Sequence, residues 1–174
     1  MALREILVAP DPVLKAKAKP VDGVDDELRQ LMDDMLDTMY DAPGIGLAAP
    51  QVGVSKRVVV VDIAHEDEPK APLYMVNPEL VWVSDEDATY EEGCLSVPEH
   101  YADVVRPAEI RVRYLDRDGK SQELQTGGLL ATVVQHEMDH LDGVLFIDHL
   151  SSLKRNMILR KLLKSRKQVL DEAS

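Results

Sequence analysis

His136, Glu137 and His140 form the pattern His-Glu-x-x-His, the strongest chemical signal in this sequence of 174 residues. On a helix, residues four positions apart lie on one face, so both imidazoles can bind a single metal ion. Glu137 would then lie beside that ion. Two histidine ligands and an adjacent carboxylate are the arrangement in which a metal activates a water molecule and the carboxylate removes its proton. The pattern predicts metal-assisted hydrolysis; the alternative is two histidines on an exposed helix face.

A catalytic metal held by two histidines needs a third protein ligand and leaves its fourth position to water. Cys94, the single cysteine, is the candidate for a soft ligand. Glu91, Glu92 or Asp103 could supply a carboxylate instead. A thiolate ligand would make the bound water less acidic, so a nearby base such as Glu137 would matter more. From the residues alone, the third ligand stays open.

A loop of glycine, proline and small residues, 43–51, ends in Gln51. Glycines let a backbone approach a ligand closely, and the Gln51 side chain carries an amide donor. The loop matches neither glycine pattern that holds phosphates. It is either a plain turn or a ligand-binding loop.

Hydrophobic periodicity predicts the elements that must position these residues. Apolar residues at helical spacing indicate helices over about 25–41 and from Gly127-Gly128 to about Leu141, the second carrying the metal motif. Ser151-Ser152 could cap a basic helix over about 151–170. Strands are expected at 57–63, 73–76, 79–84, 87–91, 110–115 and 122–126, with Asn77-Pro78 as a break.

Composition favours one globular domain over residues 1–174, with 45% hydrophobic and 30% charged residues. Aromatic residues make up only 4% and the net charge is −12, so general nucleic-acid binding is not expected. A single cysteine allows no internal disulfide and favours a reducing compartment. The sequence shows no apolar stretch long enough for a signal peptide or a membrane span. We expect a cytoplasmic protein.

Three motifs, in this order, resemble those of the bacterial-type peptide deformylases. They are Gly-Ile-Gly-Leu-Ala-Ala-Pro-Gln at 44–51, Glu-Gly-Cys-Leu-Ser-Val-Pro at 92–98 and Gln-His-Glu-Met-Asp-His at 135–140. Each motif alone is only suggestive, but the ordered set is highly specific, and the resemblance covers nearly the whole chain. It implies a metal-dependent hydrolase that removes the N-terminal formyl group from formyl-methionyl nascent polypeptides and releases formate. With the elements above, it predicts an α+β fold in which antiparallel or mixed β-sheets pack around a central metal-binding helix, with an N-terminal and a C-terminal helix.

The resemblance also implies a role for individual residues. Cys94, His136 and His140 would bind one divalent metal ion, most simply Fe²⁺, with Zn²⁺, Ni²⁺ or Co²⁺ as alternatives. Metal-bound water would attack the formyl carbon, with Glu137 as general acid and base.

Further residues would stabilise the transition state and hold the substrate. The Gln51 amide and the backbone N–H of Leu95 would stabilise the oxyanion. Backbone groups around Gly46 would align the peptide like an added strand. Three apolar side chains would line the methionine pocket: Ile45, Leu129 and Val133.

Tyr101 departs from the family pattern, because many members carry an arginine there that can contact the substrate main chain. Handling of the peptide beyond methionine is therefore expected to differ. We further hypothesise that Arg106 pairs with Asp139 behind the site. Seven basic side chains between Lys154 and Lys167 are consistent with a family helix that docks on the ribosome, and equally with a solvated face.

Two other functions are compatible with parts of the sequence. Other metallopeptidases and amidases also use His-Glu-x-x-His, although they more often take His or Glu as the third ligand. A structural metal module without catalysis is the second alternative. Such sites are closed and rarely place a carboxylate beside a ligand, so Glu137 argues against it.

Overall fold

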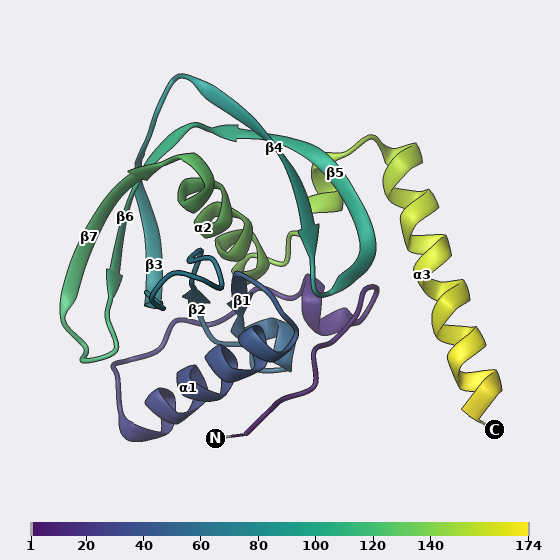
Figure 1. Cartoon of the computed structure of the whole chain (residues 1–174), viewed down its shortest axis with the longest axis horizontal. Helices are drawn as coiled ribbons and strands as arrows, with labels where there is room; N and C mark the ends of the chain where they lie inside the picture. Colours follow the sequence, from purple (N-terminus) through teal and green to yellow (C-terminus); the bar gives the residue numbers. More distant parts are fainter. Residues whose placement is uncertain (1, 174) are drawn as a thin grey trace.

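A five-stranded antiparallel sheet carries the fold of the computed structural model, which describes the backbone of residues 2–173 and the side chains of residues 2–167 (Figure 1). Its strand order is β1-β2-β3-β6-β7, and the bounds are β1 Gly46–Ala48, β2 Val58–Val61, β3 Leu73–Val83, β6 Glu109–Leu115 and β7 Ser121–Gly127. The ends of the predicted single domain, Met1 and Ser174, lie outside the described residues.

Two helices cover the opposite faces of this sheet. Successive side chains of a strand point to opposite faces, so Val58 and Val60 of β2 pack with α1 (Asp26–Asp41), whereas Val59 and Val61 pack with α2 (Gly128–Leu141). Burial on both faces explains why β2 consists entirely of valine. The predicted helices at 25–41 and 127–141 are confirmed. The Asp25 side chain accepts a hydrogen bond from Leu28 N at 2.8 Å, which caps the start of α1.

A two-stranded antiparallel ribbon, β4 (Asp87–Cys94) and β5 (Val97–Pro107), passes over α2 (Figure 1). The prediction for 87–91 was too short, and β5 was not predicted at all. Gly93 and Pro98 are usual strand breakers, so local propensity does not predict strands on the two sides of Cys94. In the ribbon, Gly93 lies opposite Tyr101, the register shifts after it so that Cys94 pairs with Val97, and the chain reverses at the two residues between them, Leu95 and Ser96.

β3 is one strand, not the two predicted on either side of Asn77-Pro78. The ladder to β6 shifts register between Val76 and Glu79, which absorbs Pro78 as an irregularity within the strand. The Asn77 side chain binds the backbone N–H and C=O of Val21 at 3.0 and 2.8 Å. These bonds hold the distorted segment in place. β2 is also shorter than predicted, and β1 lies where only a loop was expected.

Short 3₁₀ helices and α3 complete the fold: η1 Pro12–Lys15, η2 Ala49–Val52, η3 Phe146–His149 and α3 Ser152–Ala173. The start of the predicted C-terminal helix is confirmed, and the helix continues past residue 170. A third apolar cluster joins the N-terminal arm, β5, η3 and α3 through Leu14, Val104, Phe146 and Leu162. Among the described residues, no helix combines the length and the apolar character that crossing a membrane requires. The predicted α+β class is confirmed, with antiparallel strand pairs in both sheets.

Candidate active site

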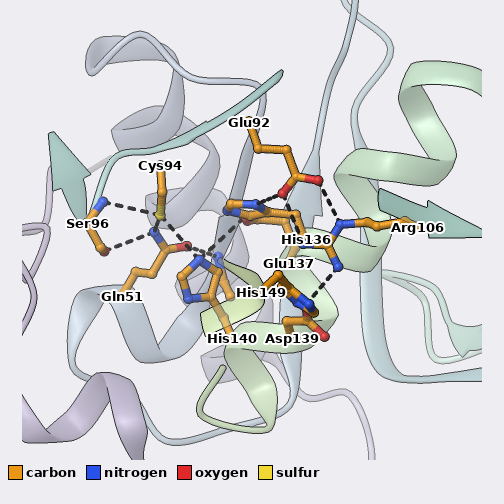
Figure 2. Close-up of polar contacts among 11 residues, drawn as sticks. Gln51, Glu92, Cys94, Ser96, Arg106, His136, Glu137, Asp139, His140 and His149 are labelled. Carbon is orange, nitrogen blue, oxygen red and sulfur yellow. Dashed lines mark hydrogen bonds and ion pairs between the residues drawn. The ribbon is translucent and has the colours of Figure 1, made fainter. Parts of the chain in front are cut away.

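Cys94, His136 and His140 converge where the end of β4 meets the buried face of α2 (Figure 2). Cys94 Sγ lies 3.3 Å from His140 Nε2, and one donor atom from each of the three side chains lies within 4.8 Å of the others. No other group of this kind occurs among the described residues. The spacing left the third donor open between Cys94 and the nearby acids, and the structure brings the thiol to the histidines.

Glu137 lies beside this group and is 2% exposed. Its Oε1 is 3.6 Å from His136 Nε2 and 3.9 Å from His140 Nε2, and its Oε2 is buried with no hydrogen-bond partner. Burial raises the pKa of Glu137 to about 7, although the charge of His136 opposes the shift. A carboxyl group with a free oxygen and a pKa near neutrality suits a general acid and base.

The charges around His136 fit a bound cation. Burial alone would lower the His136 pKa, but hydrogen bonds to Cys94 and Glu92 outweigh it and raise the pKa well above its ordinary value. At His140, burial lowers the pKa and favours the neutral imidazole. The hydrogen-bond acceptors on either side of His136, Cys94 and Glu92, therefore favour a positive charge between them. One thiolate and two imidazoles suit ions of intermediate softness such as Fe²⁺, Co²⁺, Ni²⁺ and Zn²⁺.

Glu92 fixes the orientation of the His136 ring. Its Oε1 lies 2.8 Å from His136 Nδ1, and Arg106 donates to its two oxygens at 2.7 and 2.9 Å. Burial would raise the Glu92 pKa, but the hydrogen bonds from Arg106 and His136 outweigh it and lower the pKa to about 2. Glu92 thus stays a carboxylate that accepts from Nδ1–H, and the Nε2 lone pair is left free to bind a metal.

Arg106 extends this network to the surface. Its Nη1 donates to Asp139 Oδ2 at 2.7 Å, which confirms the hypothesised Arg106–Asp139 pair. The same Asp139 oxygen lies 2.9 Å from His149 Nε2 (Figure 2). The guanidinium therefore bridges a buried and a half-buried carboxylate behind the candidate metal ligands.

Gln51 projects from η2 toward the thiol. The backbone N–H of Ala48 donates to its Oε1 at 2.9 Å, and its Nε2 donates to Ser96 Oγ at 3.0 Å and lies 3.6 Å from Cys94 Sγ. Because the carbonyl is committed to Ala48, the amide NH₂ must face the Cys94 thiol. Leu95, the residue after Cys94, lines the cavity described below. The oxyanion roles of Gln51 and Leu95 stay predictions.

A cavity of about 760 Å³ opens beside these groups, and it is lined by all of the predicted substrate-contacting residues: Ile45, Gly46, Leu129 and Val133. A Cβ at position 46 would lie 2.9 Å from Glu137 Cγ and 3.0 Å from Val133 Cγ1. Only glycine therefore lets β1 pass this close to the candidate base.

Sequence reasoning missed two contributions. Glu92 was considered only as a substitute ligand, whereas it binds the far nitrogen of His136. Histidine ligands usually need such a partner, so a carboxylate two residues before the cysteine was a usable signal. Ser96, which holds the Gln51 amide, gave no comparable signal.

Comparisons with known proteins agree with this geometry. The family described as "Polypeptide deformylase" matches residues 3–156. A peptide deformylase of Phenylobacterium zucineum is 62% identical over 167 residues, covering 96% of this chain and 99% of the relative. The crystal structure of a peptide deformylase from Ehrlichia chaffeensis superposes with a TM-score of 0.92 at 38% identity, over 97% of this chain and 99% of that one. A structure from the same organism in complex with actinonin gives a TM-score of 0.91 at 40% identity, over 95% and 98%.

Proposed function

The chain belongs to the polypeptide deformylase family, and from this premise we propose how its residues perform the reaction. The enzyme hydrolyses the N-terminal formyl group of formyl-methionyl nascent polypeptides and releases formate. The observation that best supports the residue assignment is the convergence of Cys94, His136 and His140 beside Glu137, whose second carboxylate oxygen has no partner.

In the proposed mechanism, Cys94, His136 and His140 hold one divalent ion, with Fe²⁺ as the proposed native metal. When bound, such an ion lowers the pKa of water and polarises a carbonyl oxygen. Glu137 takes a proton from the attacking water as its oxygen adds to the formyl carbon. When the C–N bond breaks, Glu137 returns that proton to the leaving amine nitrogen, and formate departs.

The oxyanion that forms during the attack needs donors that are already in place. The Gln51 NH₂ is held toward the thiol by its bonds to Ala48 and Ser96, and the backbone N–H of Leu95 follows directly after Cys94. We assign both as oxyanion donors. Preorganised donors of this kind commonly contribute about 3 kcal/mol each to lowering the barrier.

The methionine side chain is assigned to the apolar part of the cavity. Ile45 and Leu129 line it and are partly exposed, so they have apolar surface to bury when the substrate enters. Val133 lies one turn from Leu129 on α2. The backbone of Gly46 would pair with the peptide as an added strand.

The experiment that tests this function is a formate-release assay with anaerobically purified, iron-loaded protein. Formyl-Met-Ala-Ser should release formate, whereas acetyl-Met-Ala-Ser, which differs only at the acyl group, should react far more slowly. Metal-depleted protein should be inactive and should recover when Fe²⁺ is added. Absence of formate, or cleavage of an internal peptide bond instead, would favour the metallopeptidase alternative.

We also propose that the enzyme works in the cytoplasm and reaches its substrates at the ribosome through α3. Six basic side chains of α3 are exposed: Lys154, Arg160, Lys161, Lys164, Arg166 and Lys167. Lys161→Glu/Lys164→Glu should reduce co-sedimentation with ribosomes, whereas Lys17→Glu/Lys19→Glu, on the N-terminal arm, should not. Equal co-sedimentation of both variants and the wild type would remove this docking proposal.

A further inference from the structure

Tyr101 stands at the opening of the active-site cavity, where many relatives were expected to have arginine. It is 67% exposed and also lines the cavity, so its ring borders the entrance. A Cβ at Gly93, the cross-strand partner of Tyr101, would lie 2.5 Å from the ring. The ring is therefore laid across β4 on top of Gly93, with one face available for contact.

Two unpaired carboxylates lie next to this ring. Glu91 is the cross-strand partner of Asp103, and Gly93 is the partner of Tyr101, so register places Glu91, Asp103 and Tyr101 on one face of the ribbon. Like charges directly opposite each other are destabilising. Both acids are exposed, and neither forms an ion pair among the described side chains.

The entrance to the cavity is lined by carboxylates. Glu91 and Glu99 line the cavity, Asp103 lies across the ribbon from Glu91 just outside it, and none of the lining residues in the described part of the chain is Lys or Arg. Glu137, which has a buried oxygen without a partner, lines the same cavity and marks where the formyl end of the substrate would react. Whatever contacts the entrance must therefore be the part of the peptide that follows the methionine.

The distance along β4 indicates which part. Every residue from Tyr90 to Leu95 lines the cavity, so a peptide in it passes along this strand. Glu91 precedes Cys94 by three residues, which is about 10 Å in a strand and about three residues of an extended peptide. A substrate with its formyl group at Cys94 brings its second or third side chain to Glu91 and Tyr101.

From these observations we propose that Tyr101, Glu91 and Asp103 form a cation-accepting subsite, which favours formyl-methionyl peptides with Lys or Arg at the second or third position. The aromatic face attracts a cation, and the two carboxylates gain a counter-charge that the free enzyme lacks. This specificity rests on the proposed function and deepens it.

Charge-matched peptides test the subsite. We would measure kcat/KM for formyl-Met-Ala-X and formyl-Met-X-Ala, with X as Lys, Gln or Glu, at neutral pH and low ionic strength. At one of the two positions, Lys should exceed Glu by about fivefold or more, and added salt should shrink the ratio. The Lys/Glu ratio should fall to within about twofold in Glu91→Gln/Asp103→Asn, and Tyr101→Ala should lower it in part.

A matched control separates local from global charge. Glu66→Gln/Asp67→Asn removes two charges from the loop after β2, which does not line the cavity, and should keep the wild-type ratio. A wild-type ratio within about twofold at both positions, an unchanged ratio in the first double variant, or an equal loss in the control would overturn the subsite. Failure of the proposed function would look different, because the neutral Gln peptides would then release no formate either.

Discussion

At the scale of single residues, the buried carboxylate of Glu92 fixes the orientation of the His136 ring. Arg106 holds it ionised, and it accepts from His136 Nδ1, so the ring is oriented before a metal arrives. Replacing Glu92 by Gln keeps the volume but weakens both contacts and leaves Arg106 with one carboxylate partner. We expect Glu92→Gln to lower metal affinity by about 10- to 100-fold, measured by competition with a chelator of known affinity.

Glu91→Gln is the matched control for that measurement, because Glu91 is the exposed neighbour and points away from the network around His136. Its metal affinity should equal that of the wild type. If Glu92→Gln bound metal as tightly as Glu91→Gln, the orienting role of Glu92 would be wrong.

Site residues that are close together in the sequence were easier to predict than those that only the fold brings together. His136, Glu137 and His140 share one helix, so their juxtaposition follows from helical geometry alone. Cys94 is remote in sequence, and only the resemblance to a family selected it over the nearby acids. Glu92 reaches His136 because β4 crosses α2, and no local pattern encodes that crossing.

At the scale of elements, β1 positions the candidate base Glu137 because it has no side chain at position 46. Gly46 passes so close to α2 that an added methyl group would clash with Glu137 Cγ and Val133 Cγ1. Gly46→Ala should displace Glu137 or β1 and lower kcat/KM for the formyl peptide by about 100-fold. Gly23→Ala is the control, because nothing lies within 4 Å of a Cβ there. Equal activity of the two variants would show that the close approach has no catalytic importance.

The elements that were missed share a physical cause. β1 is only three residues long and begins with glycine, and β5 contains two prolines and several charged residues, so both are strands because of their partners rather than their own propensity. α1, α2 and β6 were predicted well, because their apolar periodicity is strong and continuous. The prediction split β3 into two strands at Asn77-Pro78. The strand continues there because the Asn77 side-chain amide supports the irregular residues, and the periodicity of the sequence does not reveal such a contact.

At the scale of the whole molecule, α1 and α2 bury the two faces of one sheet. Neighbouring residues of β2 belong to different apolar clusters, one with α1 and one with α2. Loss of either helix would therefore expose one face of β2, the strand on which the other helix also packs. We propose that the chain is a single domain that unfolds in one cooperative transition. Calorimetry and circular dichroism should give the same midpoint, and bound metal should raise it. Two separated transitions would contradict a single domain.

The account depends most directly on Glu137, and one paired measurement tests it. Formate release from formyl-Met-Ala-Ser and metal content should be measured on the same iron-loaded preparations of wild type and Glu137→Gln. We predict an unchanged metal content and a loss of at least about 100-fold in rate, because the amide cannot accept and return the proton. A variant that retains its metal and releases formate at close to the wild-type rate would contradict the account.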